Sequence, residues 1–311
     1  EERQMDRRTI VRVLGGSGAA VLLGACTDNI EVPGETARAP RSGSAAAAAL
    51  DPVAAAVAPE ADRGLTVINA SFEQLTGSDQ AFAFGLTTPD NEPVRGADVQ
   101  IYAIDAYGQQ RGPHAAEFRD VPAIPLGLYL TRIDLPQPGP TSLVAVTADG
   151  AAGSTTIQVT APQESAVPAP GQPAVVVPTP TSTDPQGMER VCTLDPPCGM
   201  HEVSLDEALA AGRPVVLTFA TPAYCMTAIC GPSVEIVDGV RASGDWGDTA
   251  WIHVEIFSDA GQTLSPPVEQ WGLLSEPWLF AIAADGTVRR RADGPLLVLE
   301  DHVRRLANDL A

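Results

Sequence analysis

The stretch VVLTFATPAYCMTAICGP at residues 215–232, with SEPWLFAIAADG at residues 275–286, decides how this chain is interpreted. The first stretch begins with an unbroken apolar run that predicts a buried strand, and the turn after it delivers Cys225 and Cys230 just before a helical pattern. In the second stretch, Pro277 directly precedes another apolar run that predicts a strand. A cysteine at a helix start is stabilised as a thiolate by the unpaired N–H groups and the helix dipole. The two stretches therefore indicate thiol–disulfide chemistry.

The residues around them, 188–311, predict an alternation of helices and strands. Helices are expected at 204–212, 233–240, 267–272 and 296–310, and strands at 215–219, 251–257, 278–283 and 287–291. This order resembles the thioredoxin fold, and the segment WGLLSEPWLF at 271–280 carries the best match. The resemblance implies an α/β thioredoxin-like domain. It also implies a cis-proline at Pro277, which counts among the catalytic residues, packs beside the cysteine pair and shapes a substrate groove. We expect Tyr224, Glu276 and Trp278 to line this groove. The alternatives are core packing for the two aromatic residues and a solvated loop position for Glu276.

The spacing of the cysteine pair departs from that family. Four residues separate Cys225 from Cys230, whereas the usual pair of the family has two between them. Positions five apart in a regular helix point to different faces, but Gly231 and Pro232 delay the helix start, so that residues 226–229 can form a turn. We expect a reversible Cys225–Cys230 disulfide with catalytic function. The alternative is a permanent disulfide that staples a loop.

Two further cysteines precede the first expected helix. Cys192 and Cys198 flank a short turn, and a local structural disulfide is the natural expectation. The alternative is a metal site formed with His201, but that spacing fits no strong zinc pattern, and we assign no metal. His253 lies in an apolar strand and is expected to be a packed core histidine. A copper-delivery trio of Cys225, Cys230 and His253 is a weaker possibility, taken from proteins that combine a thioredoxin fold with a cysteine pair and a distant histidine.

Composition narrows the function classes. The chain of 311 residues carries a formal net charge of −20, which argues against binding to nucleic acid or to anionic lipid. All 19 basic residues are arginine, so Schiff-base lysines and the lysine of a phosphate-binding loop are excluded. We expect no cofactor.

The N-terminal residues predict export and lipidation. Twin arginines, Arg7 and Arg8, precede a short apolar run at 13–25, which is too short for a bilayer span and ends at Cys26. This order resembles the twin-arginine signal and lipobox of bacterial lipoproteins, and it implies a signal peptide over 1–26 with Cys26 carrying lipid. Residues 27–63 are expected to form a disordered Ala/Pro/Gly tether.

Residues 64–162 predict an all-β module. Alternating runs separated by turn signals indicate six or seven strands and resemble an immunoglobulin-like β-sandwich. The segment that contains His114 is expected to be a polar Gly-Pro loop. Residues 163–187 are rich in proline and predict a semi-rigid linker.

Together these features predict a lipid-anchored protein on the extracytoplasmic face of the cell membrane. Its expected function is thiol–disulfide exchange with protein thiols or disulfides of the cell envelope through Cys225 and Cys230. A redox-inert binding scaffold with a structural disulfide is the alternative.

Overall fold

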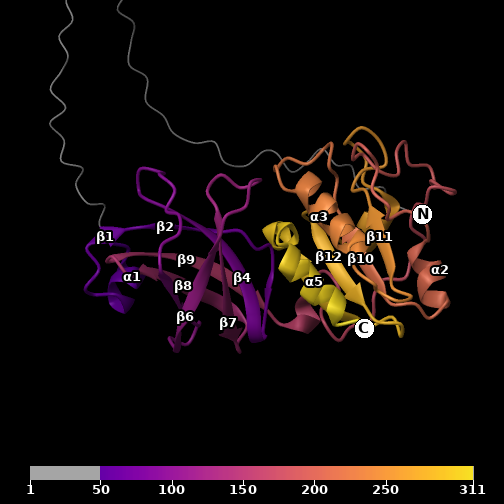
Figure 1. Cartoon of the computed structure of the whole chain (residues 1–311). Coiled ribbons are helices and arrows are strands. Elements are labelled where there is room, and N and C mark those ends of the chain that lie inside the picture. The colour runs from indigo at the N-terminus through magenta and orange to yellow at the C-terminus, as the bar shows by residue number, and fades with distance from the viewer. Residues whose placement is uncertain (1–49, 311) are drawn as a thin grey trace, which may run out of the picture. The chain divides into compact units, whose positions relative to one another are not determined.

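Two β-sheets account for most of the regular structure in residues 50–310, the part of the chain that this computed structural model describes (Figure 1). The predicted signal peptide, Cys26 and most of the predicted tether lie outside the described residues. Within the described part, no helix combines the length and apolar character needed to cross a membrane.

The first sheet has nine strands in the order β1-β9-β8-β5-β6-β7-β4-β2, with β3 paired to β9. Side chains of Phe82, Phe84 and Tyr129 stack in its core, with ring centroids 5.4 Å apart in each successive pair. Its strands are β1 (Arg63–Gly64), β2 (Thr66–Asn69), β3 (Gln74–Leu75), β4 (Gly77–Thr87), β5 (Val99–Ile104), β6 (Gln110–Arg119), β7 (Leu128–Leu135), β8 (Gly139–Thr147) and β9 (Ala151–Thr160).

This sheet differs from the predicted sandwich. The strands form one continuous sheet that nearly closes on itself like a barrel, because β2 at one end comes close to β9 near the other. Strand β6 was missed, because Gly112 and Pro113 indicate a loop. It pairs with β5 and β7, so His114 lies on a strand instead of in a loop.

Two segments predicted to be linkers are packed. Helix α1 (Pro52–Val57) lies in the predicted tether; Asp51 caps its N-terminus and Ala54 is fully buried against the first sheet. In the predicted Pro-rich linker, Val167 and Val177 are buried in the core of the second sheet. Apolar valines between the prolines therefore hold this segment against the fold, and it is no free spacer.

The second sheet has four strands in the order β11-β10-β12-β13, with bounds β10 (Val215–Phe219), β11 (Ala250–Val254), β12 (Trp278–Ile282) and β13 (Val288–Asp293). β10 is parallel to β11 and antiparallel to β12. Every residue of β10, β11 and β12 is buried, since elements pack on both faces.

Helices and loop segments cover the two faces of this sheet (Figure 1). Helix α3 (Cys230–Ala242), helix α5 (Glu300–Asn308) and the 3-10 turn at Gly294–Val298 pack with Val216 and Leu279. On the opposite face, helix α2 (Leu205–Ala210), helix α4 (Pro266–Trp271) and the valines of the Pro-rich segment pack with the alternate strand residues.

The predicted fold class, an all-β module joined by a linker to a separate α/β thioredoxin-like domain, is wrong. The described chain is nearly all-β, with short helices of 6 to 13 residues. The described residues also cluster as one compact unit. Asp293 of β13 accepts hydrogen bonds from the backbone N–H groups of Phe72 (3.0 Å) and Glu73 (3.2 Å), which joins the second sheet to the edge of the first. Patterns local in sequence identified most elements of the second sheet but not these long-range contacts.

Candidate functional site

A disulfide joins Cys225 to Cys230 in the segment between β10 and α3, with the two Cα atoms 6.1 Å apart. Cys230 is the first residue of α3 and is 0% exposed, whereas Cys225 is half-buried. The intervening turn projects outward, and Met226 is fully exposed. The disulfide can therefore be approached from solvent only at the Cys225 sulfur.

The carboxyl group of Glu276 lies beside this disulfide. One of its oxygens is within 4.8 Å of both sulfur atoms, and Oε2 accepts a hydrogen bond of 2.8 Å from the backbone N–H of Thr221. The Glu276–Pro277 peptide bond is cis. Burial raises the pKa of Glu276 to about 7, and the nearby charge of Glu255 contributes to this rise. The hydrogen bond from Thr221 and the charge of His253 both act to lower this pKa. Glu276 can therefore gain or lose a proton near neutral pH.

The two aromatic residues predicted to line a groove differ in their exposure to solvent. Tyr224 is partly exposed and its ring meets the edge of Phe257, with centroids 6.4 Å apart. Trp278, in contrast, is 3% exposed and packs between Phe72 and Phe280, with centroids 6.1 and 5.7 Å away. Trp278 is a core residue and does not line a groove, because it begins a strand that is covered on both faces.

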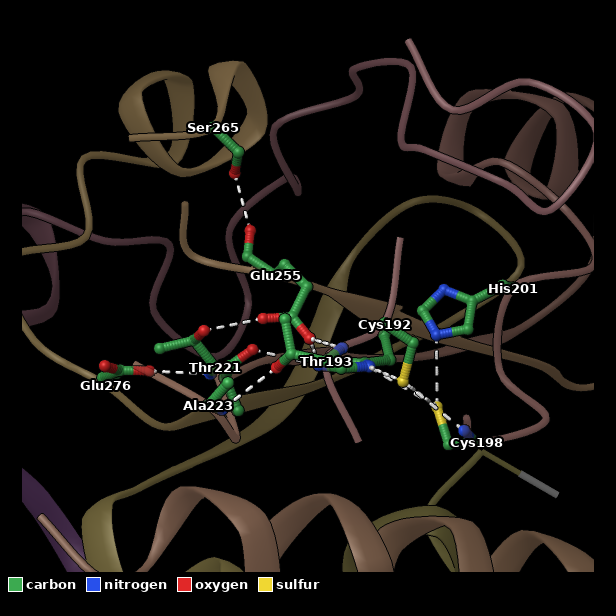
Figure 2. Close-up of polar contacts among 11 residues, drawn as sticks. Cys192, Thr193, Cys198, His201, Thr221, Ala223, Glu255, Ser265 and Glu276 are labelled. Carbon is green, nitrogen blue, oxygen red and sulfur yellow. Dashed lines mark hydrogen bonds and ion pairs between the residues drawn. The ribbon is translucent and has the colours of Figure 1, made fainter. Parts of the chain in front are cut away.

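A second group of polar side chains converges near the disulfide, and all four of its members are buried: Cys192, Cys198, His201 and His253. Figure 2 shows the first three of them. The two sulfurs are 3.7 Å apart. The Cys198 sulfur lies 3.2 Å from Nε2 of His201 and 3.4 Å from Nδ1 of His253. Nδ1 of His253 is also 3.9 Å from the Cys192 sulfur. We call these four residues the Cys₂His₂ cluster.

Backbone contacts hold the cluster together. His253 lies on β11, and its backbone N–H donates to the carbonyl of Met200 (2.9 Å), which fixes the segment 192–201 beside the strand. The ring Nε2 of His253 lies 3.0 Å from the carbonyl of Ala220. A carbonyl can only accept, so Nε2 carries a proton, and Nδ1 faces the two sulfurs.

The structure changes two predictions for these residues. The predicted Cys192–Cys198 disulfide is not formed, and both cysteines are free. His253 joins these two cysteines, so the suggested trio with Cys225 and Cys230 is not assembled. Within the pair, the hydrogen bond with Cys198 lowers the pKa of the Cys192 thiol, and the same bond together with burial raises the pKa of Cys198.

Glu255 links the disulfide to the Cys₂His₂ cluster, and its role was not predicted. Its side chain is 1% exposed and accepts hydrogen bonds from the backbone N–H of Thr193 (2.6 Å) and the hydroxyl of Thr221 (2.7 Å) (Figure 2). Thr193 follows Cys192 in the chain, and the backbone of Thr221 binds Glu276. The available sequence signal was an acid two residues after His253, because such a pair points to the same side of an extended strand.

Comparison with known proteins places the chain in no family. No family model and no curated protein matches it. Among solved structures, the Lin-41 filamin domain has a TM-score of 0.21 at 15% identity, covering 30% of this chain and 90% of that one. MtrC from Shewanella baltica OS185 has a TM-score of 0.23 at 16% identity, covering 37% of this chain and 24% of that one. The ZirS C-terminal domain has a TM-score of 0.19 at 9% identity, covering 46% and 97%. Similarities this low carry no argument about fold or function.

Proposed function

We propose that this chain performs thiol–disulfide exchange with protein substrates through Cys225 and Cys230. One observation carries the proposal: a disulfide at a helix start has one half-buried sulfur, one fully buried sulfur and a carboxyl group within reach of both. A purely structural staple needs neither the asymmetric access nor the neighbouring acid.

The exchange step follows from the difference in access. A substrate thiolate attacks the Cys225 sulfur, forming a mixed disulfide and breaking the Cys225–Cys230 bond. Cys230 leaves with the electron pair at the start of α3, where the helix dipole stabilises its negative charge. It then takes a proton, for which Glu276 is the nearby donor. A second thiolate of the substrate then attacks the substrate sulfur in the mixed disulfide. This step forms a disulfide within the substrate, and Cys225 leaves and is protonated. The substrate dithiol is oxidised and the protein disulfide reduced; the reverse reaction balances equally.

The predicted location is consistent with this chemistry. Export and lipidation at Cys26 would place the protein outside the cytoplasm, in an oxidising compartment where disulfides persist. Its substrates would then be proteins of the cell envelope.

Trapping tests the proposal. The full chain carrying Cys230→Ser, expressed in its native envelope, is expected to accumulate mixed disulfides through Cys225, seen as reductant-sensitive adducts on gels and identified by mass spectrometry. Cys225→Ser is the matched control and is expected to capture far less, because Cys230 is buried. The reduction potential of the wild-type pair is expected above about −300 mV, the range of exchangeable disulfides. A lower potential, or no adduct with either variant, would overturn the proposal in favour of a structural disulfide.

Replacing Glu276 with glutamine is expected to remove a pH dependence of the exchange rate. The measured quantity is the rate at which dithiothreitol reduces the disulfide, divided by the concentration of dithiothreitol thiolate. In the wild type this normalised rate should fall as pH rises through about 7, because Glu276 then loses the proton that it would donate. Ionised Glu276 would also repel the incoming thiolate. The E276Q variant should show a flat profile, slower than the wild type below that pH by on the order of 100-fold.

The exposed acid Glu269 on α4 provides the control, because Glu269→Gln removes the same charge away from the disulfide. Stopped-flow kinetics over a pH series would measure all three proteins. Identical profiles for the wild type and E276Q would show that Glu276 is not the proton donor.

A further inference from the structure

The Cys₂His₂ cluster has the geometry of a four-coordinate metal site. Zinc binds cysteine sulfur at about 2.3 Å and histidine nitrogen at about 2.0–2.1 Å, so tetrahedral coordination places two sulfurs about 3.8 Å apart and sulfur about 3.6 Å from nitrogen. The observed sulfur–sulfur distance is 3.7 Å, and three of the four sulfur–nitrogen distances are 3.2, 3.4 and 3.9 Å. All four donor atoms lie within 4.8 Å of one another.

We propose that Cys192, Cys198, His201 and His253 bind one Zn²⁺ ion in a closed structural site. This site shares no residue with the disulfide of Cys225 and Cys230 and is independent of the exchange function. The four ligands fill the tetrahedron, so no position is left for water or substrate, as is usual for structural zinc.

The charge balance favours a metal at this buried position. Two thiolates balance the charge of Zn²⁺ and two neutral imidazoles add none, so the complex is neutral and can be buried without an uncompensated charge. Binding converts two thiols into thiolates and releases two protons, or one where the pair already carries a thiolate. Soft sulfur and imidazole donors select zinc-type ions over magnesium or calcium.

The surroundings of His253 and Cys192 suit these two residues to bind a metal. A metal-bound histidine usually donates its other ring N–H to a carbonyl or carboxylate, and His253 makes this contact with Ala220. The backbone N–H of Cys198 points at the Cys192 sulfur, 3.4 Å away, which further stabilises a thiolate there. Three ligands come from the segment 192–201 and His253 comes from β11, so the ion would tie that segment to the sheet.

Metal analysis of the full chain tests this proposal. Protein purified under reducing conditions is expected to contain about one zinc per chain by elemental analysis, and a Cys198→Ser or His253→Ala variant below about 0.1. The Cys225→Ser/Cys230→Ser double variant is the matched control and should keep its zinc, because it removes two cysteines outside the cluster. His114→Ala on β6 is the corresponding histidine control.

Cobalt titration keeps the test decisive if a variant fails to fold. Co²⁺ added to metal-free wild-type protein should give the strong visible absorption of a tetrahedral site and a thiolate charge-transfer band, both removed by one equivalent of zinc. Absence of this spectrum, or a Cys192–Cys198 disulfide in protein isolated without oxidant, would overturn the proposal. Zinc that is lost from the Cys225→Ser/Cys230→Ser double variant would also overturn it, by placing the ion at Cys225, Cys230 and Glu276.

Discussion

Replacing Glu255 with alanine is expected to lower the free energy of unfolding by about 3 kcal/mol or more, because a buried group that loses its hydrogen-bond partner costs about 1–3 kcal/mol and two donors lose theirs. Those donors are the backbone N–H of Thr193 and the hydroxyl of Thr221, which bind the carboxyl oxygens at 2.6 and 2.7 Å. The substitution also leaves a cavity beside the Cys₂His₂ cluster. Denaturant unfolding followed by circular dichroism would measure the loss.

Glutamine at the same position separates hydrogen bonding from charge. Its amide oxygen can accept from Thr193 and its NH₂ group can donate to the Thr221 hydroxyl, so Glu255→Gln should lose about 1 kcal/mol. If the alanine and glutamine variants unfold at the same denaturant concentration, the two hydrogen bonds do not stabilise the fold, and the explanation given for Glu255 is wrong.

Replacing Trp271 with alanine is expected to cost about 3–5 kcal/mol, the range for removing a large aromatic side chain from a packed core. Trp271 is 1% exposed, and its ring centroid lies 5.3 Å from that of Phe219 and 4.6 Å from that of Phe280. These contacts fasten α4 to β10 and β12 on the face of the sheet opposite α3. The free energy of unfolding from denaturant titration would show the loss.

Phenylalanine is the informative control at this position. Within the described residues, the indole nitrogen of Trp271 has no hydrogen-bond partner, so Trp271→Phe loses packing but no hydrogen bond and should cost no more than about 2 kcal/mol. A phenylalanine variant as unstable as the alanine variant would show that the ring contacts described here do not account for the stability.

Local elements of the second sheet could be predicted from sequence, because their signals are local. The unbroken apolar run 215–219 indicated β10, and the apolar run after Pro277 indicated β12. The overall architecture could not be predicted in this way. Val167 and Val177 pack onto the second sheet from a segment whose prolines indicate a spacer, and Asp293 binds backbone more than 200 residues earlier, at Phe72 and Glu73. Local pattern does not encode contacts of that range.

The two candidate sites also differ in whether residues close in sequence or far apart form them. Cys225 and Cys230 are close in sequence, and their disulfide was expected from the turn between them. The cluster needs His253, which is 61 residues from Cys192. His253 reaches the two cysteines only because β11 pairs with β10 in the sheet. Cys192 and Cys198 alone, spaced like a local disulfide, indicate a cross-link, whereas the folded chain holds both as free thiols beside two imidazoles.

The turn enclosed by Cys225 and Cys230 also affects how damage to the chain would be observed. Met226 and Thr227 project into solvent, inside a covalent ring closed by the disulfide. A protease that cuts the backbone between the two cysteines would release nothing while the ring stays oxidised, and the nicked protein would migrate as one species until reductant separates it into two fragments. The disulfide thus keeps the two sides of this turn covalently connected after a backbone cut, but only while the two cysteines remain oxidised.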